Sequence, residues 1–437
     1  MKEKLSRFSK KMLQHELIRG SSYLFLGTFF ANVLAFLFNL FVLRKFSPSD
    51  YGDYASIMSL FTILVLPSTS LGTIIVKFAT DYFSQNHIHK AKKLFQQIFL
   101  FILVISVVFF VILFLGSQSL LSFFHIKEGV LLVWLGAIVF VSYLSMINTA
   151  FLQSILRFDF VAITAFVGSL LKLLFGILFI LLSLHTSGIF MAVFLSGFVA
   201  YIVSFYPLRS FLKEKATGAA TSVKELVVYA LPASIAIFSL SSFTSTDVLL
   251  VKHFFSPSTA GIYAGLSLIG RIIFYLTTPI ASVMFPLLIK RRNKGENVTS
   301  LLLLSSVLVV GPGVFLTAGY FLFPNLVIEI FFGGRHYPQY SQYVGFFGVF
   351  LTLFSAINVL VSFFLSLNKT KISFLVLLGA ILQAVLIFAF HRDIYQLLSI
   401  SIGISLVLLV LLLLYYGKVY GEIKKGKEVP LSYSPGL

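Results

Sequence analysis

The chain has 437 residues, of which 58% are hydrophobic and only 11% are charged, and its mean hydropathy is +1.00. Soluble proteins contain about 25% charged residues, so this composition excludes a soluble globular protein and predicts a polytopic membrane protein. The net charge of +18 does not indicate nucleic-acid binding, because a membrane topology explains where the basic residues lie. The absence of cysteine excludes disulfides, thiol catalysis and cysteine metal sites.

Apolar stretches predict an all-α chain with about twelve membrane-spanning helices in two lobes of six. A basic N-terminus at 1–21 precedes the N-lobe at 22–208. A polar linker at 209–225 leads to the C-lobe at 226–416, and a tail at 417–437 follows. We expect the spans at 22–43, 54–76, 94–115, 130–151, 160–182, 187–208, 226–252, 260–288, 300–322, 343–367, 372–390 and 395–416.

A tight hairpin joins the first two spans and recurs 209 positions later. The sequence FSPS at 46–49 returns at 255–258, Gly52 returns as Gly261, and Tyr54 returns as Tyr263. Because each lobe has an even number of spans, the two copies share one orientation in the membrane. We therefore expect two parallel repeats related by an axis along the membrane normal.

The positions of the basic residues predict the orientation. If both termini are cytoplasmic, 25 Lys and Arg residues lie on the cytoplasmic side and 6 on the outer side. Such a bias is typical of membrane proteins, whose cytoplasmic loops are enriched in positive charge. We therefore expect a multi-pass protein of the cytoplasmic membrane with both ends inside the cell.

Three ionisable residues lie far from either predicted surface, where a charge is costly and usually functional. Lys172 lies roughly 18 Å from the cytoplasmic end of the fifth span, and Arg271 roughly 16 Å from the outer end of the eighth. Asp247 in the seventh span lies about 8 Å nearer the outside than Arg271. One interpretation is a buried Asp247–Arg271 ion pair that joins two helices. The other is a central cavity in which Lys172 and Arg271 bind an anionic substrate. The two are compatible.

Uncharged polar residues in the spans extend the predicted substrate site. Asn32 and Asn39 share one face of the first span, and Asn148 and Gln153 belong to a polar face of the fourth. Hydrogen bonding between helices is the alternative role for each of these residues. Pro67 and Pro279 lie inside predicted helices and bend them, either as gating hinges or as static kinks.

Catalytic, cofactor and metal signatures are missing from the sequence. It contains no phosphate-binding GxxxxGK[ST] loop and no HExxH zinc motif, and its eight His residues are scattered. We therefore expect neither an enzyme nor a resident cofactor or metal.

Three motifs resemble those of the Wzx-type polysaccharide flippases, a branch of the multidrug/oligosaccharidyl-lipid/polysaccharide exporter superfamily. They are the turn FSPSDYG at 46–52, the kinked segment LPSTSLG at 66–72 and the outer element FFGGRHY at 331–337. With the length and the two-lobe layout, the resemblance covers essentially the whole chain. It implies a V-shaped exporter fold that moves a polyprenyl-pyrophosphate-linked oligosaccharide outward by alternating access, through a cationic central cavity.

The resemblance also implies partners: the lipid-linked oligosaccharide, the lipid bilayer, and a polysaccharide polymerase or glycosyltransferases as candidate proteins. Three other functions stay open. A drug/cation antiporter of the same superfamily should have acidic residues facing its cavity, whereas Asp247 is the only acid deep in a predicted span. A membrane glycosyltransferase or ligase should have a large outer loop with catalytic residues, which the sequence lacks. A flippase for a peptidoglycan precursor is a near neighbour.

Overall fold

The computed structural model describes residues 26–126, 128–216, 234–293, 298–335, 337–367 and 369–424. Within these ranges every regular element is a helix. Eleven of these helices are long and apolar enough to cross a membrane, and one bent pair raises the number to 12. The predicted all-α chain of about twelve spans is thereby confirmed. The predicted N-terminus at 1–21, most of the linker and the end of the tail lie outside the described residues.

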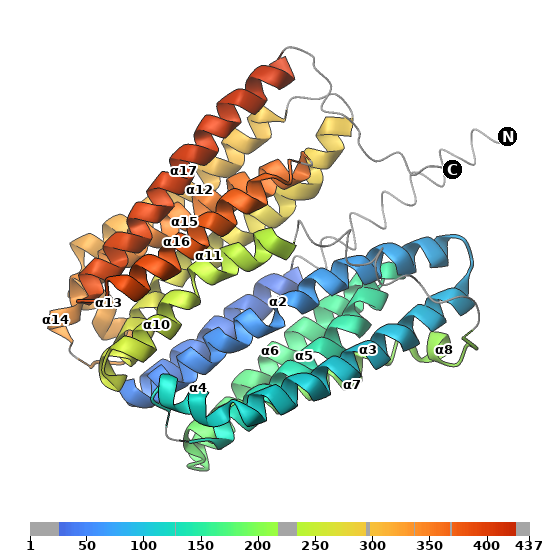
Figure 1. Cartoon of the computed structure of the whole chain (residues 1–437), viewed down its shortest axis with the longest axis horizontal. Coiled ribbons are helices and arrows are strands. Elements are labelled where there is room, and N and C mark those ends of the chain that lie inside the picture. Colours follow the sequence, from blue (N-terminus) through green and yellow to red (C-terminus); the bar gives the residue numbers. More distant parts are fainter. Residues whose placement is uncertain are drawn as a thin grey trace. The chain divides into compact units, whose positions relative to one another are not determined.

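The helices group into two compact units. The first unit covers the described part of Met1–Ser234 together with Phe255–Gly261. Within it, α5 packs against α2, α3, α6 and α7, and Figure 1 shows these helices running alongside one another. The helices of this unit are Leu26–Lys45, α2 (Pro48–Ser84), α3 (Ile88–Leu115), α4 (Ser117–Phe123), α5 (Val130–Ser154), α6 (Phe158–Leu181), α7 (His185–Ser204) and α8 (Arg209–Leu212).

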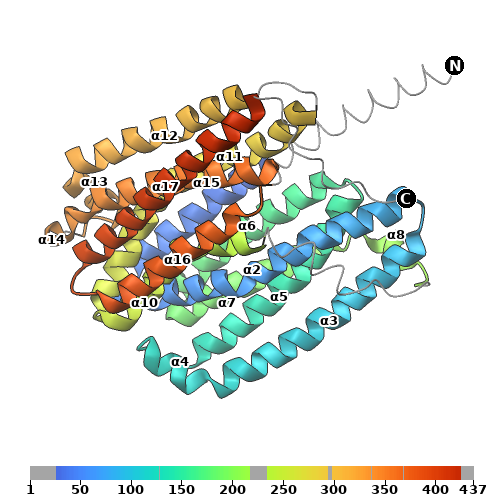
Figure 2. The same ribbon diagram turned by 45° about the horizontal axis from the view of Figure 1, so that its top comes forward.

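The second unit covers the described part of Ile235–Phe254 and Ile262–Leu437. Here α15 is central and packs against α12, α16 and α17, and α12, α15 and α17 can be followed side by side in Figure 2. The further helices are Ser234–Phe243, α10 (Thr246–Phe254), α11 (Pro257–Asn293), α12 (Thr299–Leu322), α13 (Pro324–Phe331), α14 (Pro338–Ser341), α15 (Tyr343–Ser366), α16 (Ile372–Ala389) and α17 (Ile394–Lys424).

The repeated FSPS motif is a helix start signal. Ser47 is the N-cap of α2, where its Oγ accepts a hydrogen bond from the Asp50 backbone N–H at 3.2 Å. The equivalent Ser256 accepts one from the Thr259 backbone N–H at 3.3 Å before α11. The proline after each serine fits the first helical turn, where its missing N–H leaves no acceptor unpaired. The repeated sequence therefore begins a helix in the same way at both places.

The repeated glycines lie at a close approach between the first turns of α2 and α11. A Cβ placed on Gly261 would overlap the Pro48 carbonyl oxygen, and one placed on Gly52 would lie 3.0 Å from the Gly261 backbone nitrogen. Only glycine allows the backbones to lie this close. Both turns belong to the first unit.

The seventh span differs from its prediction. The sequence predicts one helix over 226–252, but its described part consists of Ser234–Phe243 and α10, bent by 41° at the break. The sequence SSFTST at 241–246 gives the reason, since Ser and Thr side chains compete for backbone hydrogen bonds. Ser242 and Thr246 bond to each other across the break, with their hydroxyl oxygens 2.8 Å apart. Another difference is at the tail, where α17 continues to Lys424 rather than ending near 416.

Candidate functional site

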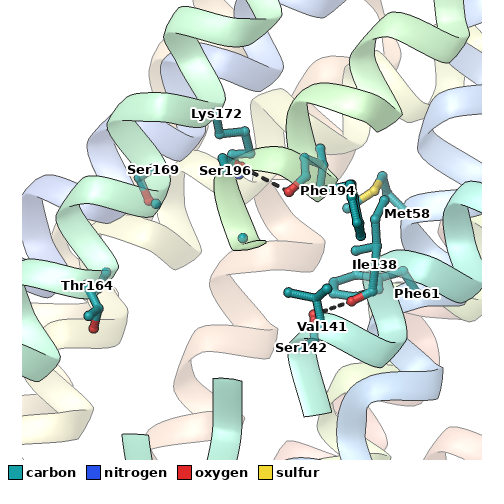
Figure 3. Close-up of a pocket in the computed structure, with 14 residues that line it drawn as sticks. Met58, Phe61, Ile138, Val141, Ser142, Thr164, Ser169, Lys172, Phe194 and Ser196 are labelled. Carbon is teal, nitrogen blue, oxygen red and sulfur yellow. Dashed lines mark hydrogen bonds between the residues drawn. The ribbon is translucent and has the colours of Figure 1, made fainter. Parts of the chain in front are cut away.

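A cavity of about 280 Å³ lies inside the first unit, between α2, α5, α6 and α7. Figure 3 shows Thr164, Ser169 and Lys172 along one helix, across from Val141 and Ser142. The cavity is lined mainly by apolar residues with a few polar groups, a composition typical of ligand sites. It is the candidate functional site.

The sequence of α6 places Lys172 in this cavity. Thr164, Gly168, Lys172 and Gly176 are four residues apart and therefore share one helical face. Gly176 lets an aromatic ring lie close against this face, because a Cβ there would come within 2.6 Å of Phe38. The small residues of α6 thus bring neighbouring helices close around the lysine.

The Lys172 ammonium is available to a ligand. Its Nζ lies 5.0 Å from the centre of the Phe38 ring, a cation–π contact that leaves the charge without a counter-ion. Among the residues that the structure describes, no carboxylate pairs with Lys172. The residue lies about 20 Å along the axis of α6 from Phe158, deep within a membrane-spanning helix.

The hydroxyl groups of the cavity differ in what they can offer a ligand. Ser142 donates to the Ile138 carbonyl at 2.7 Å and Ser196 to the Val193 carbonyl at 3.0 Å, so both present only acceptor lone pairs. The Ser169 hydroxyl has no hydrogen-bond partner in the described ranges, and it lies one turn from Lys172. Two free donors on one helical face suit an anion.

The four predicted amide ligands do not line this cavity. Asn39 donates to the Ala35 carbonyl at 2.7 Å and accepts from the Tyr54 hydroxyl at 2.9 Å, which joins its helix to α2. Asn148 donates to Ser204 at 2.8 Å and joins α5 to α7. Asn32 is exposed, and Gln153 is half-buried near the end of α5. The binding role of these residues stays a prediction.

Asp247 and Arg271 both lie in the second unit, but each has a partner of its own. Asp247 is 1% exposed and accepts a hydrogen bond from the Tyr263 hydroxyl at 2.9 Å. Arg271 donates through Nη2 to the Thr244 carbonyl. Within the described ranges these two residues form no direct ion pair. Their charges nevertheless interact electrostatically, and each residue makes its hydrogen bond elsewhere: Asp247 with Tyr263 of α11 and Arg271 at the break in the seventh span.

The predicted kinks lie inside long helices. Pro67 lies within α2, and neighbouring hydroxyls bond to carbonyls close to it: Tyr143 of α5 donates to Leu64 at 3.0 Å and Ser68 to Val65 at 2.6 Å. Position 279 lies within α11. A gating role for Pro67 and Pro279 stays a prediction.

Sequence reasoning missed Ser169 and Phe38. Ser169 was detectable, because it precedes Lys172 by three residues and three-residue spacing places two side chains on neighbouring positions of one helix face. Phe38 was not detectable, since its place under the lysine depends on the packing of another helix.

The fold is shared by a class of helical membrane transporters. An inward-facing multidrug resistance MATE family transporter of the MOP superfamily has a TM-score of 0.72 at 16% identity, with 90% of this chain and 95% of that chain covered. The lipid II flippase MurJ in an inward closed conformation has a TM-score of 0.69 at 15% identity, with 90% and 87% covered. A MATE protein in the straight conformation has a TM-score of 0.67 at 16% identity, with 94% and 96% covered. The predicted exporter fold is confirmed.

The sequence identifies the family within this class. The model of the family described as polysaccharide biosynthesis protein matches residues 41–341, and the chain belongs to this family. No curated protein matches the chain significantly. The resemblance noted in the sequence is therefore confirmed at the level of family and fold.

Proposed function

We propose that the chain is a flippase that moves a polyprenyl-pyrophosphate-linked oligosaccharide from the inner to the outer leaflet of the cytoplasmic membrane. The transported lipid would serve surface polysaccharide biosynthesis. Membership of the polysaccharide biosynthesis protein family supports the pathway. The fold similarity to a lipid II flippase and to MATE transporters supports transport by alternating access.

The physical task requires a polar route through the bilayer. A sugar and pyrophosphate head group is strongly penalised in hydrocarbon, because its charges and hydroxyls lose their hydrogen bonds to water. A cavity with cationic and hydroxyl groups replaces those bonds, while the prenyl chain stays in the lipid. This task needs no covalent chemistry, so the proposed function assigns no catalytic residue.

Lys172 is the observation that carries the proposal. A lysine near the centre of a membrane helix costs about 2.5–3.5 kcal/mol on insertion scales. In this chain no described carboxylate offsets that cost, and the ammonium instead lines a cavity beside the Ser169 hydroxyl. A site built this way favours an anion such as a phosphate group.

The same cavity argues against a cation antiporter. Its lining residues include one lysine and no acidic residue. Asp247, the acid deep in a predicted span, lies in the second unit, where it accepts from Tyr263. A carrier of cationic drugs needs acidic groups where its ligand binds, so the anionic cargo is the better match.

Reconstituted transport tests the proposal. The full chain in proteoliposomes is given a fluorescent polyprenyl-pyrophosphate-linked disaccharide, and the fraction reaching the opposite leaflet is followed by chemical quenching. We expect Lys172→Met to slow flipping about tenfold or more, equivalent to one lost charge-assisted contact of about 1.4 kcal/mol or more. Lys172→Arg should keep most of the rate.

The matched control is Lys418→Met, which makes the same chemical change at an exposed position of α17. It should leave the rate unchanged. The proposed cargo would be abandoned if the wild-type chain did not flip the probe. The role of Lys172 would be abandoned if Lys172→Met flipped the probe at the wild-type rate.

A further inference from the structure

Two arginines and two aromatic rings form a continuous series of contacts at one end of the first unit. The guanidinium carbon of Arg157 lies 4.6 Å from the centre of the Phe160 ring. In the same way, the guanidinium carbon of Arg209 lies 4.6 Å from the centre of the Tyr206 ring. The two rings stack on each other, with their centres 6.0 Å apart and their planes inclined by 27°. We call these four residues the arginine–aromatic cluster.

The position of Arg209 in the cluster is fixed by the docking of α8 onto the first unit. Phe211 of α8 is 8% exposed and stacks on Phe151 of α5, with the ring centres 5.4 Å apart. At the end of α8, the Leu212 carbonyl accepts a hydrogen bond from the Lys92 ammonium of α3 at 2.8 Å. Because both contacts hold α8, Arg209 is presented at a defined place on the surface of the unit.

The cluster lies where the head groups of the bilayer are expected. Phe160 is the third residue of α6, and Tyr206 follows the end of α7 by two residues; both helices are long and apolar enough to span a membrane. Aromatic rings are enriched at this level of a bilayer, and arginine side chains there extend toward the head groups. The predicted topology puts these two helix ends on the cytoplasmic side, where the leaflet surface is negatively charged.

The exposed part of the cluster has unused hydrogen-bond donors. Tyr206 is 59% exposed, and its hydroxyl has no partner among the residues that the structure describes. Arg209 is exposed as well, and no carboxylate in the described ranges pairs with it. Both side chains can therefore donate to oxygen atoms from outside the chain.

Asp159 sets the net charge of the cluster. Its two carboxylate oxygens accept hydrogen bonds from Nε and Nη2 of Arg157, both at 3.0 Å. Two arginines and one aspartate leave one net positive charge, which Arg209 carries. A single unpaired charge matches a phosphodiester, which has one negative charge, better than it matches a free phosphate or a pyrophosphate, which have more.

Apolar side chains next to the cluster favour a lipid over a soluble anion. Ile163 lies three residues beyond Phe160 in α6, and Ile202 lies four residues before Tyr206 in α7. Both are therefore deeper in their spans than the rings, at positions three or four residues away along the helix. They are 44% and 52% exposed. A lipid acyl chain can lie against them while its head group reaches the arginine.

We propose that the arginine–aromatic cluster is a binding site for the head group of an anionic phospholipid of the inner leaflet. The Arg209 guanidinium donates two parallel hydrogen bonds to the phosphodiester oxygens, and the Tyr206 hydroxyl donates to a further head-group oxygen. The bound lipid joins α6, α7 and α8 at the membrane surface and stabilises the first unit. The site lies outside the cavity around Lys172 and does not depend on the proposed cargo.

Lipid titrations of the purified full chain in detergent test the site, with bound lipids detected by native mass spectrometry. We expect the first phosphatidylglycerol to bind about fivefold or more tightly than phosphatidylcholine, whose head group adds a positive charge to the same phosphodiester. Arg209→Gln should weaken phosphatidylglycerol binding about fivefold, because a basic residue near an anionic surface contributes about 1 kcal/mol. Asp159→Asn should tighten it, since the change frees the Arg157 guanidinium for the phosphodiester.

The matched control is Arg392→Gln, the same chemical change at an exposed position of the second unit. It should bind both lipids as the wild type does, and the melting temperature of each variant without lipid checks its folding. The site is overturned by equal affinities for the two lipids, by wild-type binding in Arg209→Gln, or by binding in Asp159→Asn that is not tighter. Competition by soluble glycerol 3-phosphate at the lipid concentration would indicate a free-phosphate site and would also overturn it. Because no transport is measured, this site and the proposed cargo can fail independently.

Discussion

Asn148 and Ser204 connect two helices of the first unit through a hydrogen bond that water does not reach. Asn148 is 1% exposed and Ser204 is 3% exposed, and Ser204 donates its own proton to the Tyr201 carbonyl. An amide at this position would be costly without a partner. The pair therefore stabilises the packing of α5 against α7.

Truncation of this amide should lower stability without affecting transport directly. Hydrogen bonds between membrane helices contribute about 0.6 kcal/mol on average and up to about 2. We expect Asn148→Ala to lower the melting temperature in detergent, whereas Asn32→Ala, at an exposed position, should leave it unchanged. If Asn148→Ala instead abolished flipping at an unchanged melting temperature, the amide would be a ligand, as the sequence first indicated.

Single residues differ in how far the sequence reveals them. Lys172 was identified because a charge in hydrocarbon is costly wherever the helix packs. The hydrogen-bond partner of Asn148 lies 56 positions away, and a polar residue alone does not show whether it faces a cavity or a neighbouring helix. The pairing of Asp247 with Tyr263 likewise depends on the packing of α10 against α11.

At the scale of elements, the start of α11 depends on the absence of a side chain at Gly261. The Pro48 carbonyl oxygen occupies the place that a Cβ on this residue would take. A methyl group at this position must push the two helices apart.

Gly261→Ala should destabilise the chain by about 1–3 kcal/mol, the usual cost of overpacking a tight contact. The measurement is thermal unfolding of the purified protein in detergent. Gly403→Ala is the matched control, since a Cβ on this α17 glycine meets no atom within 4 Å. It should be neutral or slightly stabilising, because alanine favours helix. Equal melting temperatures for the two variants would contradict the close contact.

The sequence predicted where the helices lie better than it predicted a break inside one of them. The apolar stretches located the described spans to within several residues, because the thickness of the bilayer sets the length of each run. The break in the seventh span was not predicted, because the apolar stretch indicated one continuous helix over 226–252. The carbonyls at the break accept hydrogen bonds from Gln383 and Arg271, which lie more than 20 residues away in the chain, so the local sequence does not reveal these contacts.

For the whole molecule, the composition and the internal repeat predicted the fold. The orientation in the membrane is predicted from the distribution of basic residues between the two sides. The cytoplasmic side is predicted to hold 25 basic residues against 6 outside. Because each lobe contains an even number of spans, equivalent hairpins of the two repeats must face the same side. The parallel repeat therefore predicts the orientation of the two copies relative to each other, and the charge bias predicts which side is cytoplasmic.

Single-cysteine labelling tests both at once, since the natural chain has no cysteine. Gln118→Cys in α4 and Gln339→Cys in α14 are exposed positions on the predicted outer side, one in each repeat. They should react with a membrane-impermeant maleimide in intact cells. Gln85→Cys and Thr370→Cys are exposed positions on the predicted cytoplasmic side, and should react only after the membrane is opened. Reaction at all four sites from outside would indicate a leaky preparation, whereas opposite results for the two repeats would contradict the parallel arrangement. A complete inversion of the pattern would keep the repeat but place both termini outside, against the charge bias.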